Sequence, residues 1–263
     1  MKKQFCLILV LVLLCSCLTA CGSEADVRGE IAANQSPTEA ITGSITPQPE
    51  VTEAPTEAPT EAPTEPESNL SLGRMEGGIY TNKYVGYACQ LDSNWTFSSA
   101  AELDQALDNT KAMLSGSELV EAMGDIQQFN DMMADNAADL THMNVLYQKL
   151  TMQQRAMYLL MSEDEVIDAT LTLKDDLIAA YEQAGILVSS MEKQYVTFMG
   201  EERAAIRTEA VIVVPTESGT QEIPYFTLQI FDYHLGEYSV TTTLASYVED
   251  KTESLLELFY AVE

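Results

Sequence analysis

Cysteine is the residue type in this chain whose spacing points most directly to chemistry, because a thiolate is a strong nucleophile that can form a stable thioether. Four of the five cysteines fall within the first 21 residues, at positions 6, 15, 17 and 21. The basic start Lys2-Lys3 precedes an apolar stretch from Phe5 to about Ala20, which is short for a membrane-spanning helix. These features predict an export signal with Cys21 directly after it.

The residues Leu18-Thr19-Ala20-Cys21 resemble the lipobox of bacterial lipoproteins, in which an aliphatic residue and two small residues precede an obligatory cysteine. The resemblance implies that diacylglycerol is transferred to the Cys21 sulfur and that a signal peptide, residues 1–20, is removed before it. Cys15 and Cys17 are rival positions, but bulky Leu14 precedes Cys15, and Cys17 leaves a shorter apolar stretch. The other interpretation is an ordinary cleaved signal peptide with a chance cysteine.

Lipidation at Cys21 implies a protein anchored to the extracytoplasmic face of a bacterial cell membrane. Each buried CH₂ of an acyl chain adds about 0.8 kcal/mol of membrane affinity, so two or more chains hold a protein on a bilayer stably. We therefore expect the membrane to be a partner through the acyl chains on Cys21, with the mature chain anchored and not spanning.

Residues 21–70 have the composition of a disordered linker. They are rich in Thr, Glu, Pro, Ala and Ser, and the sequence Thr-Glu-Ala-Pro begins at residues 52, 56 and 60. Such a segment cannot bury enough apolar surface to offset its ordering entropy, and regular prolines favour an extended chain. We interpret it as a semi-stiff spacer that suits a Gram-positive cell surface; O-glycosylated threonines and a Pro-rich ligand for another protein remain alternatives.

Net charge excludes one class of partner. The chain has 13 Lys and Arg against 41 Asp and Glu, a formal charge of −28. Phosphate backbones are bound by clusters of Lys and Arg, which this chain lacks, so we expect no nucleic acid partner. With 46% hydrophobic residues the chain can still form a core, and we assign that core to residues 71–263.

Histidine is too scarce for most metal or nucleophilic sites. The two histidines, His142 and His234, both fall in predicted strands. A zinc site needs three or four ligands, and the mature chain has neither an HExxH nor a CxxC pattern. A G-x-S-x-G elbow, a Walker loop and a G-x-G-x-x-G loop are also missing. We therefore predict that the protein is not an enzyme and that it has no metal, no cofactor and no catalytic residues.

Carboxylates and methionines are the remaining candidates for a site. Asp131, Asp135 and Asp139 recur every four residues and would share one face of a helix, where they indicate either a solvated surface or a calcium site. The pairs Glu201-Glu202 and Asp175-Asp176 are expected by chance in so acidic a domain. Eight methionines lie close together, and they indicate core packing, an adaptable hydrophobic groove or a Cu(I) site. Their positions are Met113, Met123, Met132, Met133, Met143, Met152, Met157 and Met161.

Cys89 is the single cysteine of the globular part, so it cannot form an internal disulfide. It alternates with Tyr87 and Leu91 in a strand-like run, which predicts a buried small hydrophobe. A reactive thiol is the alternative.

The globular part, 71–263, is predicted to be an α+β domain because helices come first and an antiparallel strand meander follows. We predict strands at 79–80, 84–91 and 142–150, and a meander of strands at 195–199, 204–214, 223–233 and 238–245. Helices are predicted at about 99–114, from 117 through Met133, at 152–161, from Ser162 to Gly185, and at 249–260. Capping boxes are predicted at Ser99 and Ser162.

Three motifs in this domain resemble PsbP/Mog1-like domains, including those of clostridial-type surface lipoproteins. They are the opening pattern from Tyr80 to Trp95, the V-x-F-x-G at Val196, Phe198 and Gly200, and the G-x-Y…T at Gly236, Tyr238 and Thr241. Asp92 departs from the pattern, where proline is usual. The resemblance covers about 190 residues and implies an antiparallel central sheet sandwiched by helices, in a fold associated with binding or assisting partners. It brings no catalytic residue.

The function expected from these observations is a membrane-anchored lipoprotein that displays a non-enzymatic binding or scaffold domain, with a surface protein as a possible partner. One alternative is a small-molecule-binding lipoprotein that assists a membrane complex, which would have a closed apolar pocket. The other is a surface-polymer hydrolase, which would have two carboxyl groups in a cleft. A binding domain would instead expose an apolar patch near the methionine-rich helices.

Overall fold

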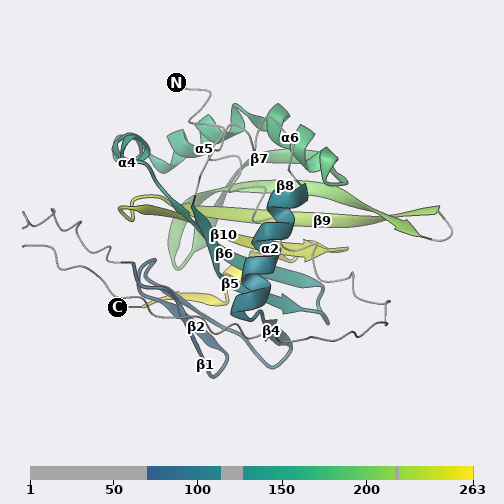
Figure 1. Cartoon of the computed structure of the whole chain (residues 1–263), viewed down its shortest axis with the longest axis horizontal. Helices are drawn as coiled ribbons and strands as arrows, with labels where there is room; N and C mark the ends of the chain where they lie inside the picture. Colours follow the sequence, from purple (N-terminus) through teal and green to yellow (C-terminus); the bar gives the residue numbers. More distant parts are fainter. Residues whose placement is uncertain (1–69, 114–126, 217–218, 263) are drawn as a thin grey trace, which may run out of the picture. The chain divides into compact units, whose positions relative to one another are not determined.

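The computed structural model describes residues 70–113, 127–216 and 219–262 (Figure 1). The predicted signal peptide 1–20, Cys21, Met123 and nearly all of the linker 21–70 lie outside these residues, as does the side chain of Met113. No helix of the described residues is long and apolar enough to cross a membrane.

Seven antiparallel strands form the larger of two sheets, in the order β4-β5-β6-β10-β9-β8-β7. Their bounds are β4 (Trp95–Phe97), β5 (Gln128–Asn136), β6 (Thr141–Lys149), β7 (Ile186–Phe198), β8 (Glu201–Thr216), β9 (Gly219–Asp232) and β10 (Tyr238–Tyr247). The predicted meander of four strands is confirmed, and its strands are longer than the sequence pattern indicated. Short turns join these strands, which is why they pair with their sequence neighbours.

A smaller sheet of four strands packs against one face of the large sheet. Its order is β1-β2-β3-β11, with bounds β1 (Arg74–Glu76), β2 (Ile79–Asn82), β3 (Tyr87–Gln90) and β11 (Phe259–Ala261). Alternate residues of each strand point into the layer between the sheets. Tyr80, Tyr87 and Cys89 therefore pack in one buried cluster with Met143 and Leu228 of the large sheet.

Helices cover the opposite face of the large sheet. Buried residues of α4 (Met152–Tyr158), α5 (Glu163–Leu171) and α6 (Lys174–Gln183) form one cluster with sheet residues such as Leu146 and Ile206. Leu107 of α2 (Ala100–Met113) belongs to the same cluster. The capping boxes predicted at Ser99 and Ser162 are confirmed, because each serine exchanges hydrogen bonds with the glutamate three residues later.

Three predicted helices are wrong in extent or type. Residues expected to continue a helix through Met133 form strand β5, in which a bulge between Asn130 and Met132 breaks the two-residue alternation that would have revealed a strand. The long helix from Ser162 is two helices, α5 and α6, separated at Thr172 and Leu173. The last helix is only α7 (Thr252–Leu256), and the chain then forms β11.

The fold class is α+β with antiparallel sheets, as predicted at that level. The finer prediction, a central sheet sandwiched by helices, is not confirmed. Figure 1 shows α4, α5 and α6 on one face of the large sheet and the small sheet on the other. The short helix α7 packs on the side of the small sheet, since Leu255 and Leu256 belong to the same buried cluster as Tyr80 and Tyr87.

Candidate interaction surfaces

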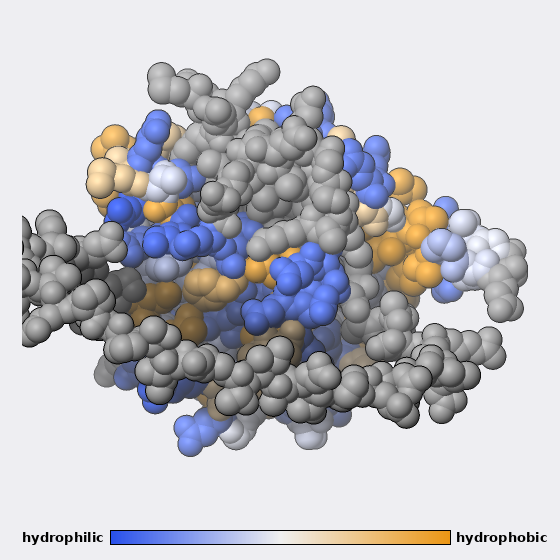
Figure 2. Space-filling model, viewed as in Figure 1, coloured by the Kyte–Doolittle hydropathy of each residue, from blue (hydrophilic) through white to orange (hydrophobic). Residues whose placement is uncertain are grey.

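Helix α4 exposes an apolar face, which we call the α4 face. Met152, Leu159 and Leu160 are 78%, 74% and 86% exposed, and exposed Ala156 lies between them. Met152 and Ala156 lie one turn apart in α4. Leu159 and Leu160 directly follow its last residue, where their N–H groups bond to the carbonyl oxygens of Arg155 and Met157 and continue the helical turn, so these residues share a surface. Figure 2 shows hydrophobic residues gathered at this corner of the molecule. Large apolar side chains grouped with such high exposure mark this face as a candidate interaction surface.

The local sequence holds α4 in this orientation. Thr151 caps its first turn and Gln154 returns a hydrogen bond to the Thr151 N–H, so both residues of the capping box are satisfied. Gln154 and Tyr158 are buried on the opposite side of the helix. Tyr158 packs against Tyr233, with ring centroids 5.2 Å apart. Because α4 is held to the domain through Gln154 and Tyr158, its apolar face points outward.

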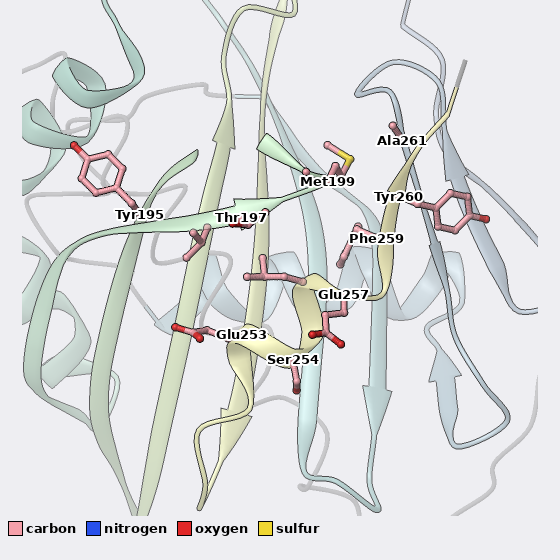
Figure 3. Close-up of a pocket in the computed structure, with 12 residues that line it drawn as sticks. Tyr195, Thr197, Met199, Glu253, Ser254, Glu257, Phe259, Tyr260 and Ala261 are labelled. Carbon is pink, nitrogen blue, oxygen red and sulfur yellow. The ribbon is translucent and has the colours of Figure 1, made fainter. Parts of the chain in front are cut away.

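A second surface is an open groove where strand β7 passes α7 and β11; we call it the edge groove (Figure 3). Its volume is about 780 Å³, within the range of ligand sites. Two segments far apart in the sequence build it, 195–200 and 253–261, so no single stretch of the chain reveals it. Its lining residues are Tyr195, Val196, Thr197, Met199, Gly200, Glu253, Ser254, Leu256, Glu257, Phe259, Tyr260 and Ala261.

Polar contacts fix α7 at the floor of the edge groove. Asp250 accepts hydrogen bonds from the Thr252 N–H at 3.0 Å and from the Thr252 hydroxyl at 2.7 Å, and it also pairs with Arg207 of β8. Burial alone would raise the pKa of Asp250, but the hydrogen bonds from Arg207 and Thr252 outweigh it and lower the pKa. Gln194 of β7 donates to Glu253 of α7 at 2.8 Å. These contacts hold α7 against β7 and β8, the last two strands at one edge of the large sheet.

The turn at one end of the groove carries backbone strain. Met199 and Gly200 join β7 to β8 with φ angles of 53° and 85°. A two-residue hairpin turn with positive φ at both positions favours Asn-Gly, and a methionine at its first position is unfavourable. Met199 nevertheless lines the groove, and Figure 3 shows its side chain beside Phe259. Strain of this kind often marks a functional position.

Charge in the edge groove is negative. Among the residues that the structure describes, Glu253, Glu257 and two tyrosines are its titratable lining residues, and no lysine or arginine lines it. Both glutamates are exposed. A glycosidase-type pair has one carboxyl group that burial keeps protonated, and neither groove glutamate is buried.

The aspartates predicted to share a helix face do not lie together on one surface. Asp131 lies in β5 and contacts the small sheet, and Asp135 accepts or shares a hydrogen bond with His142 at 2.7 Å. Asp139 lies in the following turn, 3.0 Å from Lys251, which lowers the pKa of Asp139 by hydrogen bonding and charge attraction. The prediction of a helical acidic row is therefore wrong, since these residues have separate partners.

Asp131 is part of a polar cluster between the sheets that the sequence alone did not reveal. It accepts hydrogen bonds from the Gly73 N–H, the Tyr80 hydroxyl and Asn82 Nδ2. Asn82 Nδ2 also lies 2.6 Å from the Tyr147 hydroxyl. A Cβ on Gly73 would lie 2.2 Å from the Tyr80 ring, so only glycine fits. The Y-x-N motif, Tyr80 and Asn82, is the sequence signal of this cluster, because residues i and i+2 of a strand point the same way.

The histidines do not form a catalytic or metal-binding group with the residues described. His142 lies in β6, as predicted, and is 1% exposed. His234 was predicted in a strand, but it follows the end of β9, and its Nε2 lies 2.9 Å from the Tyr158 carbonyl oxygen. No group of three His, Cys, Asp or Glu side chains within the described ranges could hold a metal ion.

Methionines divide between core and surface. Met132, Met133 and Met143 are buried, whereas Met152 lies on the α4 face; Met157 and Met161 are half-buried. Cys89 is fully buried, as predicted, with its Sγ 3.8 Å from Met143 Sδ. Burial raises the pKa of the Cys89 thiol to about 12, so the thiolate is not available at neutral pH.

Neither of the two acidic pairs lines the edge groove or belongs to the α4 face. Asp175 and Asp176 occupy the first turn of α6, where negative charge favours the helix dipole. Glu201 and Glu202 begin β8 as exposed residues, directly after the strained turn.

Comparison with known proteins adds no family assignment. No protein-family model matches this chain, and no curated protein matches it significantly.

Proposed function

We propose that the protein is a lipid-anchored extracytoplasmic lipoprotein whose globular domain, 71–263, binds another protein at the α4 face and performs no catalysis. The observation that carries this proposal is the exposure of Met152 in α4 and of Leu159 and Leu160 in the turn that ends it. An exposed apolar patch beside methionine-rich helices is the feature expected of a binding domain, and a thioether adapts to varied partner surfaces.

A protein fits the α4 face better than a membrane surface does. Residues 71–263 contain 31 acidic and 10 basic residues, so the domain carries a charge of −21. Anionic lipid headgroups repel such a domain. The membrane therefore serves as the site of anchoring through Cys21, and the linker 21–70 spaces the domain from it.

We propose no catalysis because the groove carboxylates Glu253 and Glu257 are both exposed, whereas a hydrolase of the glycosidase type needs one buried, protonated carboxyl group. A small-molecule lipoprotein is favoured less, since the edge groove is open and not a closed apolar pocket. The relation to PsbP/Mog1-like domains stays part of this proposal. The antiparallel sheet with helices on one face supports it, and the small sheet on the other face is a departure.

The proposed lipid anchor is tested by measuring whether the Cys21 sulfur carries acyl chains. Intact-mass measurement of the cell-derived protein should give a chain that begins at Cys21 and carries acyl chains, and Cys21→Ala should release the protein from the membrane fraction. Cys17→Ala is the matched control and should leave the protein anchored. An unacylated chain, or a Cys21→Ala form that remains with the membrane, contradicts the proposal.

The α4 face is tested by site-specific photo-crosslinking on intact cells. A crosslinker at position 160 should capture one protein reproducibly, whereas a crosslinker at Leu72, an exposed leucine outside α4, should not. Leu159→Glu, which places a charge in the apolar patch, should abolish that crosslink without lowering the thermal stability of the domain. Equal capture from both positions, or capture that survives Leu159→Glu, argues against a specific surface.

A further inference from the structure

We propose that the edge groove binds an extended, basic segment of another protein, which adds a strand to the free edge of β7. This surface is distinct from the α4 face, so the inference goes beyond the function proposed above. Extended peptides commonly bind in this way to an exposed sheet edge, where backbone hydrogen bonds supply affinity and neighbouring pockets supply specificity.

The groove lies where an edge strand of the large sheet meets an edge strand of the small sheet. Strand β7 is the last strand of the large sheet, and β11 is the last strand of the small sheet; within the described residues each has a partner on one side only, β8 and β3. An edge strand presents a row of unpaired N–H and C=O groups on its outer side. The edge groove thus offers the backbone of β7 to an incoming strand, with β11 and α7 beside it (Figure 3).

Only the groove part of β7 lacks the features that protect edges from pairing. Charged residues and bulges normally prevent edge strands from adding other chains. The first part of β7 has a bulge between Val188 and Ser190, followed by the charged residues Glu192 and Lys193. The stretch Tyr-Val-Thr-Phe at 195–198, which borders the groove, has no charge, no proline and four residue types that favour strands. The unprotected stretch and the groove coincide.

Charge selects a basic occupant. Glu253 and Glu257 line the groove without a lysine or arginine beside them. The nearby cations are already engaged, since Lys193 pairs with Asp164 and Asp168, and Arg207 pairs with Asp250. An incoming lysine or arginine would therefore meet uncompensated negative charge, in a domain that is acidic as a whole.

The negative charge of the groove also argues against two other occupants, a second copy of this chain and its own linker 21–70. A second copy would bring its own Glu253 and Glu257 against this groove, and each domain carries −21. The linker 21–70 has ten acidic residues and one basic residue, and its prolines lack the N–H that a strand ladder needs. Charge repulsion therefore disfavours binding of a second copy or of the linker, and we assign the groove to a separate, basic chain.

The test uses the full chain purified in detergent and a fluorescently labelled nine-residue peptide in which lysine alternates with valine and threonine. Anisotropy should give saturable binding that weakens as salt is raised. The same peptide with alternate backbone nitrogens methylated should bind at least tenfold more weakly, because methylation removes the ladder donors. The peptide with glutamate in place of lysine should not bind. Amide exchange of residues 195–198 should slow when the lysine peptide is bound.

Two variants test the groove itself. The double change Glu253→Gln and Glu257→Gln should weaken the lysine peptide by about fivefold for each ion pair lost. The matched control, Glu222→Gln with Glu249→Gln, removes two exposed acids outside the groove and should leave affinity unchanged. Met199→Asn should relieve the turn strain, leaving the fold intact, but should weaken peptide binding because an apolar lining side chain is lost.

Three results would overturn the proposal. They are equal binding of the methylated peptide, equal binding of the glutamate peptide, or an affinity that the groove variants leave unchanged. Concentration-dependent dimerisation that slows exchange of residues 195–198 without peptide would make a second copy the occupant and would also overturn it.

Discussion

Asn82 lies at the centre of the polar contacts between the two sheets. It is fully buried, its Nδ2 donates to Asp131 and Tyr147, and its Oδ1 accepts from the N–H groups of Tyr84 and Val85. The carboxylate of Asp131 is half-buried, and withdrawing a carboxylate from water is tolerable only when its oxygen atoms are hydrogen-bonded. Asn82 therefore shares with the Gly73 N–H and the Tyr80 hydroxyl the compensation of a charge in the interface between the sheets.

Asn82→Ala should destabilise the domain by about 2–4 kcal/mol, because several buried polar groups lose their partner at once. Urea unfolding followed by tryptophan fluorescence measures this change. Asn94→Ala, in an exposed turn, is the matched control and should cost well under 1 kcal/mol. Equal losses in the two variants would show that the interface does not rely on Asn82.

At the scale of elements, capping boxes make stability depend on pH. Glu165 accepts hydrogen bonds from the N–H and the hydroxyl of Ser162 at the start of α5, and these bonds lower its pKa below the ordinary value of 4.5. A carboxyl group whose pKa is lowered on folding stabilises the protein fully above its unfolded pKa. That contribution is lost as the pH falls through the lowered, folded pKa.

Glu165→Gln should therefore make the domain less sensitive to acid, since glutamine keeps an acceptor for the Ser162 N–H but does not titrate. The measurement is the free energy of unfolding at intervals from pH 7 to pH 2, where the variant should show a shallower decline below pH 4.5 than the parent. Glu182→Gln, an exposed change outside any capping box, should leave the decline as it is. A parallel decline in the parent and Glu165→Gln would contradict the assignment.

Elements with regular local signals could be predicted from the sequence, and irregular ones could not. Ser99 and Ser162 mark helix starts by their own hydrogen bonds, so a local pattern sufficed for them. Strand β5 was missed because its bulge shifts the alternation, and β11 was missed because its partner β3 lies about 170 residues earlier. Strand identity there depends on tertiary pairing, which no local window contains.

At the scale of the whole molecule, Cys89 reports on opening of the small sheet. It is buried between the sheets, and Phe259 of β11 lies opposite it in the ladder. With a pKa of about 12 the thiol should resist alkylation in the native state, and its labelling should require unfolding. Mass spectrometry of the Cys89 peptide after timed iodoacetamide labelling measures this. Rapid, complete labelling without denaturant would mean that the small sheet opens on its own.

The candidate surfaces were predictable to different degrees. Cys21 and the methionine-rich region stand out in the sequence, and a possible adaptable apolar surface followed from Met152 and its neighbours. The edge groove did not, because β7, α7 and β11 meet only after folding. Its one local trace is Met199, a residue type that a hairpin turn with positive φ normally avoids.

The hydrogen bonds between Gly73 and Asp131, 2.9 and 3.1 Å long, have a mechanical consequence. Gly73 directly precedes β1, and Asp131 belongs to β5, an inner strand of the large sheet. A pull transmitted along the preceding chain would otherwise unzip the three-residue strand β1 from its outer side. With these two hydrogen bonds the load passes directly into β5, the second strand of the larger sheet, before it reaches β1.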